Sequence, residues 1–223
     1  LETLGFATRL EEPGHWFEPE EVTWIETQEE HEKYKRAAQH NLILQYFRYD
    51  SCVFVSKNIK MLMTGERFVP ELRGEIAYEH LHRYHIALEY VQNKRVLDIA
   101  CGAGYGAAFL ASRAVHIVGV DVSKETIEFA RRRYGYVKNL EFQEGSCEAI
   151  PCETGSVDVV VSFETIEHIE NHEAFLQEIG RVLSNNGILI LSSPNKQTYT
   201  DEANHRNPYH KRELYKSDLH ALV

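Results

Sequence analysis

The chain has 223 residues, of which 43% are hydrophobic and 26% are charged. This length and hydrophobic content allow one well-buried core, with or without an appendage, and exclude a disordered or fibrous protein. Acidic residues outnumber basic residues by 34 to 24, for a net charge of −10, which argues against a nucleic-acid-binding surface because phosphate contacts require clustered Lys and Arg.

Cysteine usage and hydropathy predict the compartment. The four cysteines form no disulfide framework and no C-x-x-C pair, as is typical of a reducing environment. No apolar run is long enough to span a bilayer, and no signal peptide is recognisable. We therefore predict a cytoplasmic protein without a membrane span. Because the chain begins at Leu1 rather than at a methionine, we expect a domain or processed fragment of a larger, multidomain chain.

The first 60 residues carry no motif that indicates chemistry. They are rich in Glu, with a helix predicted over Gln28–Phe47 and a short strand over Ser51–Ser56. We interpret residues 1–60 as an N-terminal helical appendage or the tail of a preceding domain, and residues 61–223 as the main domain.

The next predicted helix covers Glu75–Val91 and has an apolar face that includes Tyr84. Three histidines, His80, His82 and His85, lie within it. His80 and His82 are separated by about 200° around a helix, so they are not expected to share a metal ion.

The stretch Arg95–Asp121 reads as strand, glycine loop, helix, strand and acid. Its apolar run Val96–Ala100 indicates a buried strand, and the three glycines within Gly102–Gly106 allow the backbone to approach a ligand closely. A second apolar run ends on Asp121. This order is typical of a βαβ nucleotide-binding unit, in which the final acid accepts hydrogen bonds from ribose hydroxyls.

Asp98, inside the first of these strands, discriminates between two kinds of cofactor. The glycine pattern alone also satisfies the dinucleotide fingerprint, but a dinucleotide places its pyrophosphate over the glycine loop, where a carboxylate would repel it. S-adenosylmethionine has no phosphate, and its sulfonium and ammonium groups would be attracted by Asp98. The residue therefore favours S-adenosylmethionine.

Strands and helices continue to alternate after Asp121. Ser123 is a predicted N-cap, and Asn185–Gly187 is predicted to end a helix and form a turn. The expected strands are Leu140–Phe142, Val157–Phe163 and Ile188–Leu191, and the expected helices follow Ser123, run through Phe175–Leu183 and cover Glu213–Val223. This alternation predicts an α/β fold with a doubly wound, mostly parallel, Rossmann-like sheet and helices on both faces.

The segment after Val157–Phe163 carries the candidate chemistry. Ligands of doubly wound sheets bind beyond the carboxyl ends of the strands, near the point where strand order reverses, which places Glu164 and His168 beside the reactive part of a cofactor. His168 and His172 stand four residues apart, but no third ligand has a suitable spacing, so no metal site is predicted. The alternative role for His168 is to brace the loop.

The run Asp98-Ile99-Ala100-Cys101-Gly102-Ala103-Gly104 is similar to the first motif of class I S-adenosylmethionine-dependent methyltransferases, and the likeness covers most of Thr64–His220. The resemblance implies S-adenosylmethionine as the cofactor. It also implies a set of cofactor-binding residues: Asp98, Gly102 and Gly104 at the methionine end with Ala100 beside them, Asp121 at the ribose with Val122 next to it, Ser146 and Cys147 at the adenine edge, and Phe163 at the end of the fourth strand.

Three further expectations come from the same resemblance. The helix before the first strand often lies over the cofactor, so Arg83 or Tyr84 would contact the methionine end; the alternative is a solvated Arg83 and a core Tyr84. The family commonly has Gly-Asp-Ala where this chain has Gly145-Ser146-Cys147, which leaves a backbone contact for the adenine. The family's last two strands are missing, so either the chain is truncated or another segment, such as Ser51–Ser56, covers the sheet edge.

The acceptor is also suggested by resemblance. The lead-in Thr64–Pro70 is similar to that of methyltransferases encoded with or fused to glycosyltransferases, and Asn207–His210 is similar to a pattern in polysaccharide-associated methyltransferases. This implies O-methylation of a saccharide or other small-molecule hydroxyl, with His168 first and His210 second as the general base. Two alternatives remain: a non-catalytic module that binds S-adenosylmethionine or a partner, and a nucleotide-dependent oxidoreductase, which leaves Asp98 unexplained.

Overall fold

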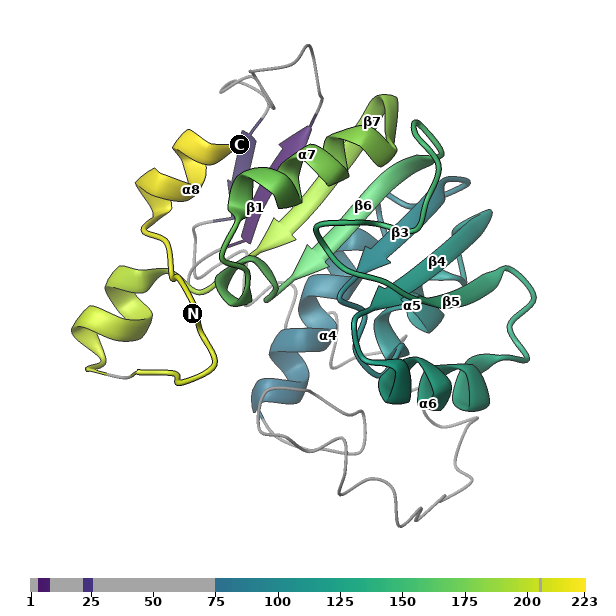
Figure 1. Cartoon of the computed structure of the whole chain (residues 1–223), viewed down its shortest axis with the longest axis horizontal. Helices are drawn as coiled ribbons and strands as arrows, with labels where there is room; N and C mark the ends of the chain where they lie inside the picture. The colour runs from purple at the N-terminus through teal and green to yellow at the C-terminus, as the bar shows by residue number, and fades with distance from the viewer. Residues whose placement is uncertain (1–3, 9–21, 26–74, 205) are drawn as a thin grey trace.

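The computed structural model of the chain describes residues 4–8, 22–25, 75–204 and 206–223 (Figure 1). These residues form one seven-stranded sheet with the order β2-β1-β7-β6-β3-β4-β5. The strands are β1 Leu4–Thr8, β2 Val22–Ile25, β3 Arg95–Ile99, β4 His116–Asp121, β5 Leu140–Glu144, β6 Val157–Phe163 and β7 Leu183–Ser192. The five strands from β7 to β5 are parallel to their neighbours, which confirms the predicted doubly wound sheet.

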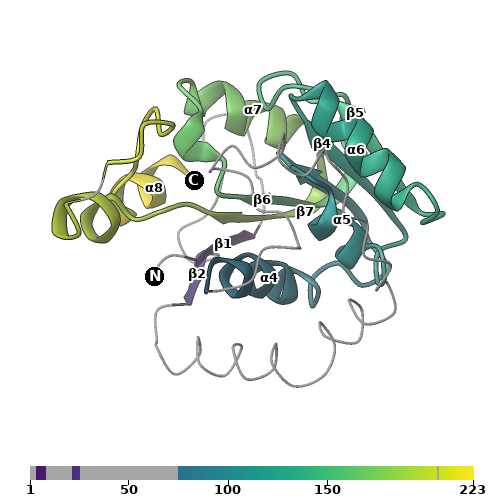
Figure 2. The same cartoon turned by 90° about the horizontal axis from the view of Figure 1, so that it is seen from below.

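Helices cover both faces of the sheet, as predicted. They are α4 Glu75–Ala87, α5 Tyr105–Leu110, α6 Lys124–Tyr134, α7 His172–Val182 and α8 Lys216–Leu222, with short helical turns η2 at Ile166–His168 and η3 at Gln197–Glu202. One hydrophobic core contains residues of α4, α5 and α6, and a second contains residues of α7 and α8. Figure 2 shows α4 and α5 on one side of the sheet and α7 on the other.

The central strands supply side chains to both cores because successive residues of a strand point to opposite faces. In β3, Val96 packs in the core beneath α4 and α5, whereas Leu97 packs in the core beneath α7. In β6, Val159 and Val161 belong to the first core and Val160 to the second. All five side chains are essentially inaccessible to solvent. Burial on both faces explains why these strands are almost continuously apolar in the sequence.

The edge of β7 is covered by a segment that the sequence did not identify. β1 pairs antiparallel with β7, from Leu4 opposite Ser192 to Thr8 opposite Ile188, and β2 pairs antiparallel with β1. These residues fall within the range interpreted as a helical appendage or a preceding domain, but β1 and β2 belong to the same seven-stranded sheet as the main domain. The candidate strand Ser51–Ser56 and the helix Gln28–Phe47 lie outside the described residues.

The connection between α7 and β7 also differs from the prediction. α7 ends at Val182 and β7 begins at the next residue, so Asn185–Gly187 lies within the strand and not in a turn between two elements. The pairing of β6 with β7 shifts register between Val157 and Val159, and this irregularity accommodates the extra residues. Among the described residues, no helix is long and apolar enough to cross a membrane.

Candidate active site

A cavity of about 790 Å³ opens at the carboxyl ends of the parallel strands. From β3 the chain proceeds outward through β4 to β5, and then returns to the other side of β3 with β6, so β3 and β6 flank the point where strand order reverses. This is the position at which doubly wound sheets bind ligands. Its wall is formed by the glycine loop, the ends of β4 and β6, the loop after β5 and two residues of α4, His80 and Tyr84. The volume is within the range of small-molecule sites.

The ends of β3 and β6 both carry strained backbone. Ala100 has φ of 60° and Glu164 has φ of 50°, a left-handed conformation that costs non-glycine residues free energy. Both residues line the cavity. Strained residues are retained where the surrounding structure enforces them, and they concentrate at functional sites. The strained residues therefore lie where the strand order reverses, at the carboxyl ends of β3 and β6, and this observation does not depend on any sequence motif.

The two predicted glycine contacts have different surroundings. Gly102 lines the cavity with φ of 54°, and a Cβ built on it would meet nothing within 4 Å. Gly104 has φ of 80° and does not belong to the lining; a Cβ there would lie 2.6 Å from the ring of Phe142. Gly102 thus leaves space for a ligand against the backbone, whereas Gly104 allows the start of α5 to pack closely on β5.

Asp121 is held firmly at the end of β4. It is 5% exposed and lines the cavity. Its Oδ2 accepts a hydrogen bond from the Gly102 backbone N–H at 3.0 Å, and its Oδ1 accepts one from the Ser123 N–H at 2.8 Å. Ser123 is the N-cap of α6, as predicted, and its hydroxyl accepts from the Thr126 N–H. Each carboxylate oxygen retains acceptor capacity, which suits a pair of ribose hydroxyls.

Asp98 is buried beneath Tyr84. The Tyr84 hydroxyl donates to the carboxylate, at 3.1 Å from Oδ1 and 3.2 Å from Oδ2, and Tyr84, not Asp98, lines the cavity. The pKa of Asp98 is raised to about 7, chiefly by burial: the Tyr84 hydrogen bond lowers the pKa, the charge of Asp121 raises it, and burial outweighs both. Tyr84 also contacts Tyr105 and Phe163 edge to face. Asp98 is therefore a buried acid, and the Tyr84 side chain lies between it and the cavity.

Arg83 is neither solvated nor part of the cavity wall. Its Nη2 lies 3.3 Å from Oε1 of Glu164, and the two side chains are 15% and 23% exposed. The same Glu164 oxygen accepts a hydrogen bond from the Ser192 hydroxyl at 2.7 Å. Arg83 thus fixes Glu164, a residue of the lining, from behind. The nearby His80 does line the cavity, with its Nδ1 3.1 Å from the Tyr105 hydroxyl. Burial, with Arg83 nearby, lowers the pKa of His80 to about 4.

The predicted adenine contacts come from the loops that follow β4 and β5. Val122, Ser146 and Cys147 all line it. Val122 is 72% exposed, so it offers an apolar surface that nothing in the described residues covers. The Ser146 hydroxyl accepts a hydrogen bond from the Glu148 N–H at 3.1 Å, which leaves its own proton for another partner. Burial raises the pKa of the Cys147 thiol to about 12, so it behaves as a small apolar group and not as a nucleophile.

The two candidate catalytic histidines lie side by side. His168 ends η2 and lines the cavity, and its ring is 5.0 Å from that of His210, measured between centroids. The backbone N–H groups of Lys211 and Arg212 donate to the Glu167 carbonyl, at 2.8 and 3.1 Å, and so tie the segment after β7 to η2. This explains how residues 42 positions apart (210 − 168) become neighbours. His210 itself is not part of the lining.

Glu167 completes this group of side chains. It is 1% exposed, and one of its oxygens, Oε2, accepts from the Ser193 hydroxyl at 3.1 Å. Burial, aided by the charge of Glu164, raises the pKa of Glu167 well above its usual value. The sequence analysis did not single out Glu167. Its position in a helical turn between two candidate residues, Glu164 and His168, was the only signal available.

The structure brings most of the predicted cofactor residues to one cavity. The lining contains Ala100, Gly102, Asp121, Val122, Ser146, Cys147 and Phe163, together with the catalytic candidate His168. Asp98, Gly104, Arg83 and His210 lie behind it and support residues of the wall. The lining also contains His80, Tyr105, Thr165 and Tyr209, which the sequence analysis did not assign. His80 and Tyr84, one helical turn apart on α4, could have been proposed together from their spacing.

Fold and cavity together define a Rossmann-like nucleoside-binding domain. Residues 97–191 match the family model described as a methyltransferase domain. A probable S-adenosylmethionine-dependent methyltransferase of Mycolicibacterium smegmatis is 34% identical over 171 residues, which cover 72% of this chain and 63% of that protein. Phthiotriol/phenolphthiotriol dimycocerosates methyltransferase 1 of Mycobacterium ulcerans is 34% identical over 127 residues, covering 55% and 46%. These matches support assigning the matched region to the class I S-adenosylmethionine-dependent methyltransferases.

Structural comparison supports this family membership. The crystal structure of YcgJ from Bacillus subtilis superposes with a TM-score of 0.58 at 28% identity, covering 64% of this chain and 66% of that chain. The family's cofactor is S-adenosylmethionine, as the sequence predicted. The chain spans 63% and 46% of the lengths of the two relatives described above.

Proposed function

We propose that this chain transfers the methyl group of S-adenosylmethionine to a hydroxyl oxygen of a small-molecule acceptor. The observation that carries the proposal is the cavity at the strand-order reversal, with a doubly fixed Asp121 at one wall and His168 at another. The match of residues 97–191 to a methyltransferase domain supports it. Among relatives, the Mycobacterium ulcerans enzyme is named for phthiotriol and phenolphthiotriol dimycocerosates, and two ester groups on a triol leave a hydroxyl free, which favours a hydroxyl acceptor.

The residues of the cavity fit this cofactor. Asp121 would accept hydrogen bonds from the ribose hydroxyls, and the open space above Gly102 would admit the chain that joins the ribose to the sulfur. Val122 and Cys147 would contact the adenine ring through apolar surface. At the other end, the Tyr84 hydroxyl and the acid beneath it would receive the ammonium group. This last contact makes Asp98 the counter-charge of a cation, acting through Tyr84.

The bound cofactor supplies a methyl group on a positively charged sulfur that is already a good leaving group. The chain's own residues would hold the acceptor oxygen in line with that methyl carbon and exclude water. The oxygen–carbon bond forms as the carbon–sulfur bond breaks, the electron pair remains on sulfur, and the acceptor hydroxyl gives up one proton. We propose that His168 activates this hydroxyl, with His210 packed against it. A saccharide acceptor is supported by the sequence resemblance of Thr64–Pro70 and Asn207–His210 alone.

Calorimetry with the full chain tests the cofactor assignment. We expect S-adenosylmethionine to bind wild type, and Asp121→Ala to weaken binding by about 10- to 100-fold, since hydrogen bonds to a charged group contribute roughly 1.5–3 kcal/mol. Asp158→Ala is the matched control, because this carboxylate lies in the first half of β6, pairs with Arg95 and does not line the cavity. Equal affinities for both variants would contradict the ribose assignment.

Turnover separates an enzyme from a non-catalytic module. In an assay for S-adenosylhomocysteine over a panel of hydroxyl acceptors, His168→Ala should lower kcat by about 10²- to 10⁴-fold, the usual range for loss of acid–base assistance. Its affinity for S-adenosylmethionine should stay close to that of wild type. Tight cofactor binding by wild type with no product from any acceptor would instead identify a binding module.

A further inference from the structure

The group formed by Glu167, His168 and His210 has the composition of a metal site. One ligand atom from each of the three side chains lies within 4.8 Å of the other two. Two imidazoles and one carboxylate form a donor set that suits divalent transition-metal ions. The group stands where η2 meets the segment after β7, beside the cavity that His168 lines.

The hydrogen bonds of His168 and His210 fix the tautomers that a metal requires. Nδ1 of His168 lies 3.1 Å from the Tyr209 carbonyl oxygen, which can only accept, so this nitrogen carries the proton. Nδ1 of His210 lies 2.6 Å from Oε1 of Glu213 and is likewise a donor. Each ring therefore directs its protonated nitrogen toward a backbone or carboxylate oxygen. This is the arrangement that orients metal-binding histidines in proteins.

The second nitrogen of His210 is an electron-pair donor. Nε2 lies 3.0 Å from Nδ2 of Asn207. The orientation of that amide is fixed, because its Oδ1 accepts a hydrogen bond from the Tyr209 N–H at 3.0 Å, so the amide presents N–H groups to the ring. A ring nitrogen that faces an N–H donor must be deprotonated. A metal at this nitrogen would replace one hydrogen bond from Asn207.

Glu167 supplies the independent indication of a missing ligand. Its side chain is 1% exposed, and its Oε1 has no hydrogen-bond partner among the residues that the structure describes. A buried carboxylate oxygen without a partner costs free energy, of the order of 1–3 kcal/mol or more. A cation held by the two imidazoles would satisfy this oxygen. The group therefore contains donor atoms that can bind a metal ion and a buried carboxylate oxygen that a metal ion would satisfy.

We propose that Glu167, His168 and His210 bind one divalent transition-metal ion, which holds and activates the acceptor hydroxyl. Three protein ligands leave coordination positions open for a substrate oxygen, as in catalytic metal sites. With the ion bound, His168 acts on the hydroxyl through the metal and not as the base that takes its proton. Coordination lowers the pKa of the bound hydroxyl, whose proton passes to solvent water while the oxygen attacks the methyl carbon. The role of the ion rests on the proposed function, but its binding does not. The expected acceptor is a molecule whose hydroxyl is accessible enough to enter a metal's coordination sphere.

Titration of the untagged, metal-free full chain with Co²⁺, followed by visible absorption, tests the site directly. We expect one equivalent to bind wild type with bands typical of imidazole ligation. Glu167→Gln, which keeps the shape of the side chain, and His168→Ala should each weaken binding by at least about tenfold, the lower range for disturbing a metal site. His116→Ala is the control, because His116 begins β4 at the amino ends of the parallel strands, whereas the cavity lies at their carboxyl ends, and it contacts only Glu141 in the hydrogen bonds described for it.

Each outcome decides the question. Circular dichroism identifies any variant that fails to fold, and Glu167→Gln and His168→Ala test the site separately. A wild-type chain that binds no Co²⁺, or three variants with the same affinity, would overturn the metal site. Calorimetry with S-adenosylmethionine on the same metal-free protein keeps the two proposals apart: cofactor binding without Co²⁺ binding overturns the metal site alone, and Co²⁺ binding without cofactor binding overturns the proposed function alone.

Discussion

Gly102 and Gly104 have the same left-handed backbone but different neighbours, so alanine should affect them differently. Gly104→Ala adds both backbone strain and a methyl group against Phe142. We expect it to lower the free energy of unfolding by about 2–4 kcal/mol, combining strain and overpacking. Gly102→Ala adds strain alone, about 1–2 kcal/mol, yet fills the ligand space. Urea unfolding and cofactor calorimetry together check both; an equal loss of stability would contradict the packing role of Gly104.

Asp98 should destabilise the fold at high pH. Its folded-state pKa of about 7 lies above the ordinary value of 3.8, so the folded protein holds a proton that the unfolded chain releases. Stability therefore falls as pH rises from about 4 to 7 and stays low above that range. Asp98→Asn removes this dependence. We expect the variant to match wild type near pH 4 and to exceed it at pH 8, by at most about 4 kcal/mol, since one pKa unit corresponds to 1.36 kcal/mol.

Urea unfolding at both pH values measures this effect, and a variant whose advantage is the same at pH 4 and pH 8 would contradict it. If Asp98 serves as the counter-charge of the cofactor, Asp98→Asn should also bind S-adenosylmethionine more weakly. A more stable, less functional variant is the expected signature of a buried charge kept for binding. Asp158→Asn provides a comparison, because its hydrogen bonds with Arg95 lower the pKa of that carboxyl to about 2, opposite in direction to Asp98.

The position of a single site residue could be predicted from the sequence where that residue directly follows one strand. Asp121 follows β4 directly, and its place at the cavity needs no more than the strand and the loop beside it. The cover of Asp98 by Tyr84 could not be predicted in the same way, because it depends on how α4 packs over the glycine loop. The pairing of Arg83 with Glu164 has the same origin. Contacts between elements far apart in the chain leave no local pattern in either element.

At the scale of elements, the sequence did not predict β1 and β2, because their pairing in the sheet depends on backbone hydrogen bonds and leaves no pattern of side chains. β3, β4 and β6 are buried on both faces, so their apolar runs identify them. β1 lies between β2 and β7 through main-chain hydrogen bonds, which any residue except proline can make. The need for a cover on the sheet edge was therefore predictable, and the structure places β1 on the β7 edge; the candidate strand Ser51–Ser56 lies outside the described residues.

A proline substitution in β1 tests whether the sheet depends on the backbone hydrogen bonds of this strand. β1 has a neighbour on each side, so the N–H of every residue in the pairing serves one of them, and Ala7→Pro removes one such donor. We expect a loss of about 3 kcal/mol or more in the free energy of unfolding, and increased light scattering because the β7 edge becomes available for pairing between chains. Ala7→Gly keeps the N–H and should cost about 1 kcal/mol. Similar values for the two variants would argue against the pairing.

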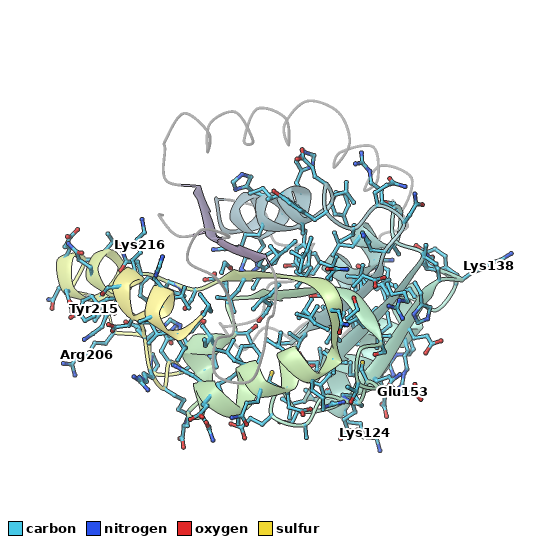
Figure 3. The ribbon with its side chains drawn as sticks, turned by 90° about the horizontal axis from the view of Figure 1, so that it is seen from above. Lys124, Lys138, Glu153, Arg206, Tyr215 and Lys216 are labelled. Carbon is cyan, nitrogen blue, oxygen red and sulfur yellow. The ribbon has the colours of Figure 1, made fainter. Side chains whose placement is uncertain are left out.

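At the scale of the whole molecule, the segment after β7 extends the cavity wall away from the sheet. Figure 3 shows Tyr215 and Lys216 at the opposite end of the molecule from Lys124 and Lys138. This segment returns to the site through its backbone hydrogen bonds to Glu167 and contributes Tyr209 and Lys211 to the lining. The parallel strands thus position most of the predicted cofactor residues, whereas Tyr209 and Lys211 come from a segment beyond the matched residues 97–191.

The pairing of Leu4 with Ser192 also has a consequence for biosynthesis. β1 precedes all the other described strands in the chain, so it cannot pair with β7 until the intervening residues have been translated. Until then β2 is the neighbour available to β1, and contacts between distant parts of a chain form slowly. A chaperone that binds the nascent chain after β7 has been made but before β1 has paired with it would therefore meet an unpaired β7 edge.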